Sequence, residues 1–506
     1  MSVFFDEVGP ELYRENAFRI TGLPVDATAR DIRRRSEELR LKERLGVSQG
    51  SGAAVLPLSP PPDATVTDQA MQRLRDPARR LEDEFFWFWP SRDGGPDEAL
   101  AALRRGDADT AERLWRESSA DPATAAHNLA VLAHVRALDR AAGQEHGGGL
   151  DPDGRALWER AFAYWSRVVA DPAVWTRVDT RVAQIADPRL TLETTTRMRS
   201  RLPAALLSIN ARLAVRAARD GRHDDAAAQV ALMRRSGFAT ATVMDVLARA
   251  VEPETARLHS LGENAERTVD AAPDRGAEVT ARFLEQAASL LGTLRVLLDE
   301  GDPAVQGAGD EIASRVLRCL VPYARATDDW QTTVGLLEQA LPLAATESVR
   351  TRIEENLAAA RSNLLFATCW FCRVNPTHQP STHEQKMWGD LRTEYVGPYI
   401  RYNWQRIAIG VPRCASCAAR HRRTIMAGRW VSLALLAASV LALAVLDGGL
   451  AIAVILFGAC VLAWFGSRPR HGLPRGALQQ VMAFDPVRER LSAGWLLGDR
   501  QGGGQV

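Results

Sequence analysis

Two closely spaced pairs of cysteines stand just ahead of the only long apolar stretch in this chain of 506 residues. Cys369 and Cys372 form the first pair, and Cys414 and Cys417 form the second. Residues 430–466 follow them with a single charged residue among them. An apolar run of that length is typical of a membrane segment. The sequence therefore predicts a soluble part followed by a cluster of thiols, which lies next to a membrane anchor.

The apolar stretch is too long for one membrane helix and has the right length for two. Trp430–Leu446 and Leu450–Gly466 contain 17 residues each, close to the lower limit of about 17–25 residues that cross hydrocarbon. Asp447-Gly448-Gly449 between them predicts a turn. Arginines flank both sides, within 422–429 and within 468–475. Because arginine- and lysine-rich segments next to a membrane span remain on the cytoplasmic side, we expect a two-span hairpin in a bacterial-type inner membrane, with both chain termini cytoplasmic.

The cysteines predict a zinc site. The N-terminal residues 1–8 have neither a basic flank nor a long apolar core, so they are not a secretory signal. Residues 1–427 are then expected in the cytosol, where thiols stay reduced. Two Cys-x-x-Cys turns supply the four thiolates of a tetrahedral structural zinc. The predicted metal ligands are Cys369, Cys372, Cys414 and Cys417.

Residues 366–421 are expected to form a small, β-containing unit of the zinc-ribbon type. The 41 residues between the two cysteine pairs exceed the usual interval of about 15–20, which predicts an inserted pair of strands or an inserted loop. Aromatic and β-branched residues alternate with polar ones from Tyr395 to Val411, as strands require. Beyond the membrane hairpin at 430–466, residues 467–506 form a cytoplasmic tail with a short amphipathic element at Leu478–Gly498.

Two other readings of the cysteines remain open. One pair could cycle between thiol and disulfide, although no βαβ setting surrounds it and no obvious helix begins at Cys414 to lower a thiol pKa. Three histidines close in sequence, His378, His383 and His421, could also replace a cysteine as ligand, and they rank below the four thiols.

The N-terminal segment, residues 1–90, predicts three helices. Asn16–Ile20 is short and ends at Gly22, and Thr28 with Asp31 forms a capping box for a second helix. A third helix is expected over Val66–Phe86. It leads into Phe85-Phe86-Trp87-Phe88-Trp89, an aromatic run that we expect to seal this segment against the next one.

The same segment resembles a degenerate J-domain, the helical module of DnaJ-type co-chaperones. The resemblance rests on Phe18-x-Ile20-x-Gly22-Leu23, on Thr28–Ile32 and on Ala70-x-x-x-Leu74-x-Asp76-Pro77-x-x-Arg80. It implies docking to a DnaK-type chaperone. J-domains stimulate that chaperone through a His-Pro-Asp element, however, and the first histidine of this chain is His127. Stimulation of ATP hydrolysis is therefore not expected.

Residues 96–365 are expected to form a helical-hairpin array. A pattern of alanines around a Gly-Asp, Gly-Arg or Asp turn occurs at Ala102–Leu114, Ala217–Val230 and Tyr323–Leu341. These stretches resemble tetratricopeptide repeats, although their spacing is irregular; a generic all-α domain is the alternative. Tryptophans at helical spacing, Trp158 to Trp175, are expected in the core. His127 and His134 are expected to be structural histidines rather than ligands.

The composition and the remaining motifs exclude several functions. A net charge of +1 gives no basic field for nucleic acid. Neither of the two lysines, Lys42 and Lys386, follows a glycine, so a Gly-Lys-Ser/Thr phosphate loop cannot exist. Gly46-Val-Ser48-Gln-Gly50 enters a proline-rich loop instead of joining a strand to a helix, as a nucleophile elbow must. Since no acid, base and nucleophile assemble, we do not expect an enzyme; a transferase site within the helices is the weakest alternative.

Together these features predict a mainly α protein. It would combine a J-like three-helix module, a repeat-like helical-hairpin array, a small β-containing zinc ribbon and two transmembrane helices. The expected role is a membrane-anchored, cytosol-facing adaptor that binds proteins, with a DnaK-type chaperone or client proteins as candidate partners and a lipid bilayer as its support. The alternative from a different class is a thiol–disulfide redox protein.

Overall fold

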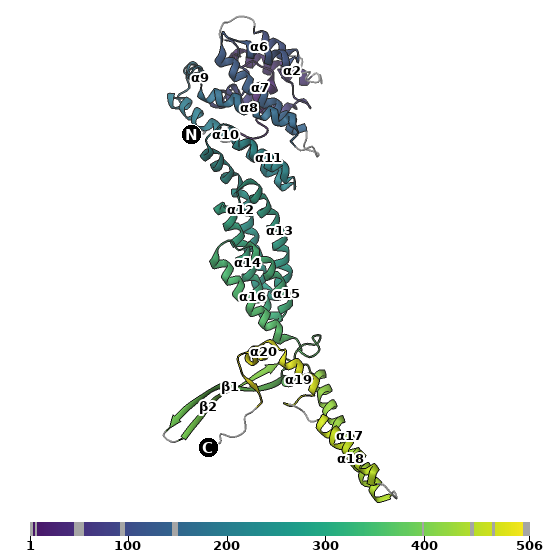
Figure 1. Cartoon of the computed structure of the whole chain (residues 1–506). Coiled ribbons are helices and arrows are strands. Elements are labelled where there is room, and N and C mark those ends of the chain that lie inside the picture. The colour runs from purple at the N-terminus through teal and green to yellow at the C-terminus, as the bar shows by residue number, and fades with distance from the viewer. Residues whose placement is uncertain are drawn as a thin grey trace. The chain divides into compact units, whose positions relative to one another are not determined.

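The computed structural model describes residues 4–5, 8–44, 55–91, 97–143, 150–396, 399–445, 450–467 and 471–498. The chain divides into two compact units. The first comprises Met1–Asn264 with Phe283–Glu311, and the second comprises Ala265–Arg282 with Ile312–Val506. Helices dominate the described residues of both units, and one small sheet accompanies them (Figure 1). The mainly α class with a small β part is therefore confirmed.

The helices that lie wholly within the first unit begin and end at these residues: α1 Ala17–Thr21, α2 Ala29–Arg44, α3 Ala64–Arg73, α4 Pro77–Phe85, α5 Glu98–Arg104, α6 Ala108–Glu117, α7 Pro122–Gly143, α8 Pro152–Ala170, α9 Pro172–Ile185, α10 Leu192–Arg219 and α11 His223–Arg234. Three long helices contain residues of both units: α12 Thr240–Ala271, α13 Gly276–Leu297 and α14 Pro303–Thr327.

Local signals fix the first helices as the sequence predicted. The Asn16 side chain accepts hydrogen bonds from the backbone N–H groups of Phe18 and Arg19 at the start of α1, and Gly22 ends that helix with φ at +67°. The capping box is also present. The Thr28 N–H donates to the Asp31 carboxylate at 3.0 Å, and the Asp31 N–H donates to the Thr28 hydroxyl at 3.3 Å.

The single helix expected over Val66–Phe86 is wrong, because the chain forms α3 and α4 there with a break between them. The Asp76 carboxylate accepts from the N–H groups of Ala78 and Arg79, so it starts a new helix. Pro77 occupies the first position of α4, where its missing N–H costs nothing. In the interior of one long helix the same proline would have removed a hydrogen bond.

The aromatic run after α4 is buried against the helices that follow, as expected. The Phe85 ring stacks on Trp175 with centroids 5.5 Å apart, and Phe88 stacks on Trp115 at 5.6 Å. The Trp89 ring lies 3.6 Å from the His127 ring. Each member of the run, from Phe85 to Trp89, is at most 6 % exposed. The run therefore joins the N-terminal helices and the array into one core.

Two of the three expected helical hairpins are present as closely packed helix pairs. The pair α5–α6 turns at Gly106 with φ at +81°, and α10–α11 turns at Gly221 with φ at +77°. The third pair joins α14 to α15 (Trp330–Ala340) at Asp328. The alanines of the pattern, such as Ala102 and Ala111, are fully buried, because small side chains let paired helices approach closely.

The second unit continues with these elements: α15 Trp330–Ala340, α16 Glu347–Ala367, β1 His383–Val396, β2 Tyr399–Val411, α17 Ala415–Val445, α18 Leu450–Ser467, α19 Arg475–Met482, α20 Asp485–Ser492 and β3 Leu496–Leu497. Short 3-10 turns cover Pro273–Arg275, Leu341–Leu343 and Gln379–Ser381. The sheet has the order β2-β1-β3.

The predicted inserted strand pair is the antiparallel hairpin of β1 and β2, which pairs His383 with Val411 at its base. β3 belongs to the tail beyond the apolar helices, yet it pairs with β1 at Met387 and Trp388. Segments on either side of α17 and α18 in sequence therefore meet in one sheet.

Candidate metal centre

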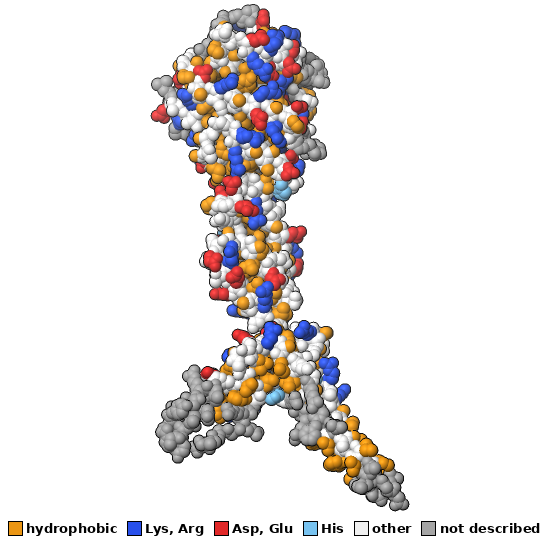
Figure 2. All heavy atoms as spheres, in the orientation of Figure 1, with side chains coloured by type: hydrophobic (Ala, Val, Ile, Leu, Met, Phe, Trp, Pro, Cys, Tyr) orange, Lys and Arg blue, Asp and Glu red, His pale blue; other side chains and the backbone are white. Residues whose placement is uncertain are grey.

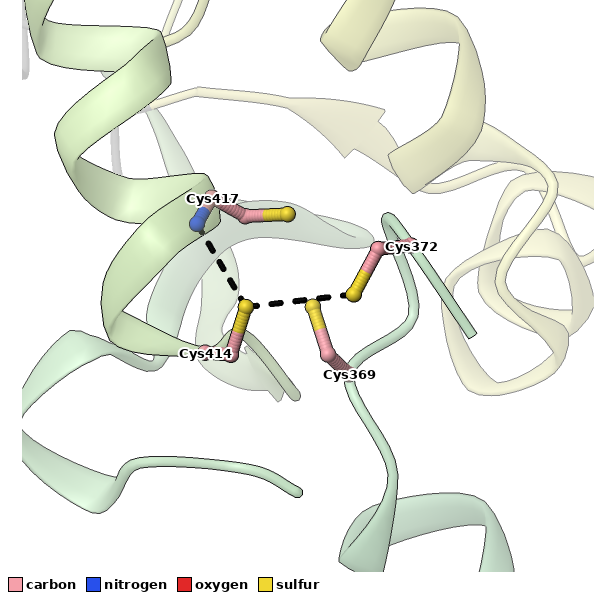
Figure 3. Close-up of side chains that lie close together, drawn as sticks. All are labelled: Cys369, Cys372, Cys414 and Cys417. Atoms are coloured by element: carbon pink, nitrogen blue, oxygen red, sulfur yellow. Dashed lines mark hydrogen bonds between the residues drawn. The ribbon is translucent and has the colours of Figure 1, made fainter. Parts of the chain in front are cut away.

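The four predicted cysteines come together in the second unit. All four Sγ atoms lie within 4.8 Å of one another, and Figure 3 shows them converging on one point. The sulfurs of Cys372 and Cys414 are 3.8 Å apart. Cys369, Cys414 and Cys417 are buried, and Cys372 is half-buried. The cluster can hold a metal ion, and we call these four residues the cysteine clamp.

The first half of the clamp is a tight turn after α16. The Cys369 N–H donates to the Asn375 carbonyl at 2.9 Å, and the Cys369 carbonyl accepts from the Arg373 N–H at 2.8 Å. Arg373 takes the left-handed conformation, with φ at +53°. This fold of the backbone turns both thiols of the pair inward.

The second half of the clamp is the first turn of α17, which corrects the expectation that no helix begins there. The Cys417 N–H donates to the Cys414 Sγ at 3.4 Å, and the Cys414 carbonyl accepts from the Ala418 N–H at 3.0 Å. Cys414 therefore occupies the N-cap position, where serine or aspartate would usually stand. The same helix continues to Val445, so the clamp and the apolar segment share one rigid element.

The surroundings of the clamp favour thiolates at some positions. Burial raises the pKa of Cys414, but the N–H of Cys417 and the side chain of Asn375 outweigh burial and bring that pKa down to about 6. The N–H groups of Asn375 and Val374 lower the pKa of Cys372. Burial raises the pKa of Cys369. A bound metal requires deprotonated cysteines, and the amides that lower these pKa values are the ones that face the sulfurs.

The structure does not bring the three alternative histidines into the clamp. The His378 Nδ1 lies 2.8 Å from the Ser381 hydroxyl. His383 is buried at the start of β1, and the His421 ring packs edge-on against Phe371 with centroids 4.8 Å apart. Two residues that sequence reasoning missed do contact the sulfurs. The Asn375 amide donates to Cys414 Sγ at 3.7 Å, and the Arg420 guanidinium donates to Cys417 Sγ at 3.3 Å.

The C-terminal tail completes the core around the clamp. Phe484 is fully buried and contacts Trp370 edge-on with centroids 5.0 Å apart. The Trp370 indole N–H donates to the Gln480 carbonyl at 2.6 Å. Trp495 covers Gly389 so closely that a Cβ at that glycine would lie 2.5 Å from the indole. The tail is thus a folded part of this unit, with α19, α20 and β3 in place of one amphipathic element.

Two membrane-spanning helices were expected, but among the described residues one helix, α17 over Ala415–Leu441, is long and apolar enough to cross a membrane. Only 11 % of its apolar stretch is buried, unlike the core helix of a soluble protein. Trp430 and Leu441 are 66 % and 64 % exposed. In Figure 2 hydrophobic side chains are frequent on the visible described surface of α17 and of α18, which packs along it. The expected turn at Asp447-Gly448-Gly449 lies outside the described residues.

Comparisons with protein-family models, with curated proteins and with solved structures return no match for this chain. The resemblances to J-domains and to tetratricopeptide repeats therefore rest on the motifs in the sequence alone. Helical hairpins are present in the array, and membership of either family is not shown.

Proposed function

We propose that the chain is a membrane-anchored, cytosol-facing adaptor that binds proteins, and that a structural zinc joins its soluble part to its anchor. One observation carries the proposal. The cysteine clamp includes the first turn of α17, and this helix exposes an apolar surface of the kind that soluble proteins bury. The clamp thus lies between α16, the last helix of the soluble part before it, and α17, the apolar helix, where it can fix one to the other.

The donor set supports zinc as the metal. Four cysteines favour zinc or an iron–sulfur cluster over hard cations. Zn–S bonds of about 2.3 Å in a tetrahedron give S···S edges of about 3.8 Å, and the sulfurs of Cys372 and Cys414 are separated by 3.8 Å. A disulfide would need about 2.05 Å. A zinc bound by the clamp would supply structure by fixing the turn after α16 to the start of α17.

The tail supports a hairpin with both ends on one side of the membrane. Leu473, Val481 and Phe484 follow α18 in sequence, yet they share a core with Cys369 and Cys414, which precede α17. A folded core cannot be divided by a bilayer. This contact requires an even number of crossings between Cys414 and Leu473, and in the proposed hairpin α17 and α18 would each cross the membrane once. Arginines on both flanks then place that side in the cytoplasm.

The absence of a defensible catalytic set and the hairpin array favour protein binding over catalysis. Paired helices offer grooves for peptides or partner helices. A chaperone-related role in assembly or quality control is the specific form that the J-like motif suggests, with a DnaK-type chaperone or its clients as partners.

The joint is tested with the variant Cys414→Ser in the full-length, detergent-solubilised chain. The wild type should contain about one zinc per chain, and the variant should lose most of it while its far-ultraviolet circular dichroism stays helical. The matched control is Cys319→Ser, which changes a buried cysteine outside the clamp. A wild type free of zinc, or a variant with full zinc content, would contradict the proposed joint.

A thiol–disulfide redox protein is the second candidate, and one observation favours it. Cys414 is an N-cap thiol with a pKa near 6, as is typical of a reactive cysteine at a helix start. This candidate predicts a dithiol that titrates reversibly in glutathione buffers, whereas the zinc joint predicts four thiols that react only after a chelator is added.

A further inference from the structure

A hollow in the first unit is lined by residues of α2, α4 and α9, and arginines dominate its charge. Its volume is about 620 Å³. Arg33, Arg75, Arg80 and Arg181 line it, and among the described lining residues Asp26 is the one carboxylate. Ala29 and Pro77, the first residues of α2 and α4, also line it. Helix N-termini carry partial positive charge and helix C-termini partial negative charge. Because Ile185, the last residue of α9, lines the hollow too, it is the arginine side chains that favour an anion here.

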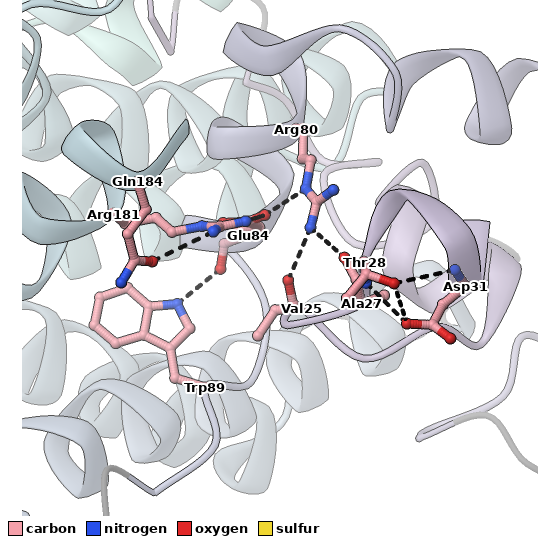
Figure 4. A network of polar contacts seen from close by, with 9 residues as sticks. All are labelled: Val25, Ala27, Thr28, Asp31, Arg80, Glu84, Trp89, Arg181 and Gln184. Carbon is pink, nitrogen blue, oxygen red and sulfur yellow. Dashed lines mark hydrogen bonds and ion pairs between the residues drawn. The ribbon is translucent and has the colours of Figure 1, made fainter. Parts of the chain in front are cut away.

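Two of these arginines are held rigidly. The Glu84 carboxylate, 5 % exposed, accepts from Arg80 Nε at 2.6 Å and from Arg181 Nε at 2.6 Å (Figure 4). Arg80 Nη2 also donates to the carbonyl groups of Val25 and Ala27. Glu84 and Asp26, which acts electrostatically on Arg181, together balance these two positive charges, so the excess positive charge of the hollow is that of Arg33 and Arg75. Since both side chains are already ordered, an anionic ligand would lose less conformational entropy on binding.

The other two arginines are available. Arg33 and Arg75 are exposed, and neither makes an ion pair with any described residue. Their guanidinium groups can each present two parallel N–H donors to a carboxylate. The hollow therefore combines two arginines that Glu84 holds in place with two exposed arginines that can bind an anion.

The hollow, at about 620 Å³, is larger than a small ion would fill. Ile32, Leu74 and Ile185 line the hollow, and of these Ile185 is the one that is half-buried rather than buried. A second hollow, of about 470 Å³, shares Arg181 with the first and continues along Trp89. An extended peptide would present acidic side chains to the arginines and apolar side chains to the rest of this surface.

We propose that these two hollows form one groove, and that it binds an extended segment of a partner protein in which acidic and apolar residues alternate. The inference rests on the proposed adaptor role and assigns it a site and a partner chemistry. The groove takes residues from both the N-terminal helices and the array, so the docking of these parts through Phe85–Trp89 creates it.

The test measures fluorescence anisotropy of a labelled peptide of alternating glutamate and leucine, with the full-length chain in detergent and empty micelles as the blank. A peptide of alternating lysine and leucine is the charge control. We expect the glutamate peptide to bind and the lysine peptide not to bind. The double variant Arg33→Glu/Arg75→Glu should raise the Kd of the glutamate peptide at least about tenfold, or about 1.4 kcal/mol.

The matched control is Arg40→Glu/Arg105→Glu, which changes the net charge equally at exposed arginines outside the groove. It should keep the wild-type Kd, and raising the salt from about 50 mM to about 500 mM should weaken binding to the wild type. The groove would be ruled out if the two peptides bound with equal affinity. It would also be ruled out if both double variants raised the Kd of the glutamate peptide equally. If inorganic phosphate displaced the labelled peptide as effectively as unlabelled peptide does, a peptide would not be the ligand that this groove selects.

Failure here is distinguishable from failure of the adaptor role. Zinc content and membrane partition of Arg33→Glu/Arg75→Glu report on the joint and the anchor, which lie in the second unit. A variant that is anchored and loaded with zinc, but that binds the glutamate peptide as tightly as the wild type, contradicts the groove alone.

Discussion

Acid should destabilise the first unit through two buried histidines. Burial lowers the pKa of His127 and of His134 from 6.5 to about 3. The His134 Nδ1 lies 3.1 Å from the Tyr13 hydroxyl and accepts from the Trp165 indole N–H at 3.3 Å. Protonation of that nitrogen would remove the acceptor. The neutral histidine is thus the form that the fold stabilises.

The magnitude follows from the two pKa values. As the pH falls below 6.5, the unfolded chain binds a proton on each histidine while the folded chain does not, so the free energy of unfolding decreases until about pH 3. Between pH 7 and pH 5 the loss is about 2 kcal/mol for each histidine and about 4 kcal/mol for both. Stability from these groups is fully present above pH 6.5.

The assay is urea unfolding of the full-length chain at several pH values, followed by tryptophan fluorescence. Trp89 stacks on His127 and Trp165 contacts His134, so the signal arises beside the two groups. The variant His127→Gln should reduce the pH dependence of the first unit's stability by about half, because one of its two buried histidines with a strongly lowered pKa is removed. The reasoning would be refuted if the free energy of unfolding fell by less than about 1 kcal/mol between pH 7 and pH 5. An unchanged pH dependence in the variant would refute it as well.

Three further predictions concern the second unit and the J-like motif. Phe484→Ala should destabilise the core around the clamp by about 3–5 kcal/mol and speed zinc removal by a chelator. The control Leu496→Ala, which changes a side chain that is 53 % exposed, should change the rate of zinc removal little. Equal rates in the two variants would contradict the role of the tail in completing this core. Reporter fusions at both chain ends should score cytoplasmic and a reporter inserted at Gly448 should score external; ends on opposite sides would exclude the hairpin. The full-length chain should not accelerate ATP hydrolysis by a DnaK-type chaperone. A several-fold increase in the rate of hydrolysis in a steady-state assay would make active co-chaperone the leading function.

Local chemistry made much of the fold predictable. Asn16, Gly22 and the pair Thr28–Asp31 act within four residues of themselves, so the sequence alone indicated where α1 ends and α2 begins. The break before α4 carried an equally local signal, Asp76 followed by Pro77, but the apolar periodicity through Leu74 and Leu81 concealed it. Hydrophobic spacing predicts that residues are helical, and it does not distinguish one helix from two in line.

The candidate site was predictable in its ligands and not in its surroundings. Cys-x-x-Cys spacing is a local signal, and it located all four thiols. The helix start at Cys414 was missed because a cysteine takes the place of the usual capping residue. The packing of Phe484 and Trp495 around the clamp depends on contacts between residues far apart in sequence, for which spacing carries no signal.

The continuity of α17 has a mechanical consequence. Cys417 precedes Trp430 by 13 helical residues, which correspond to about 20 Å at 1.5 Å per residue. In the proposed topology this length acts as a rigid spacer that sets the height of the clamp above the hydrocarbon. A helix adapts to bilayer thickness by tilting, and a helix without a hinge would tilt the clamp with it. Local bilayer thickness would thereby set the angle at which the clamp stands above the membrane surface.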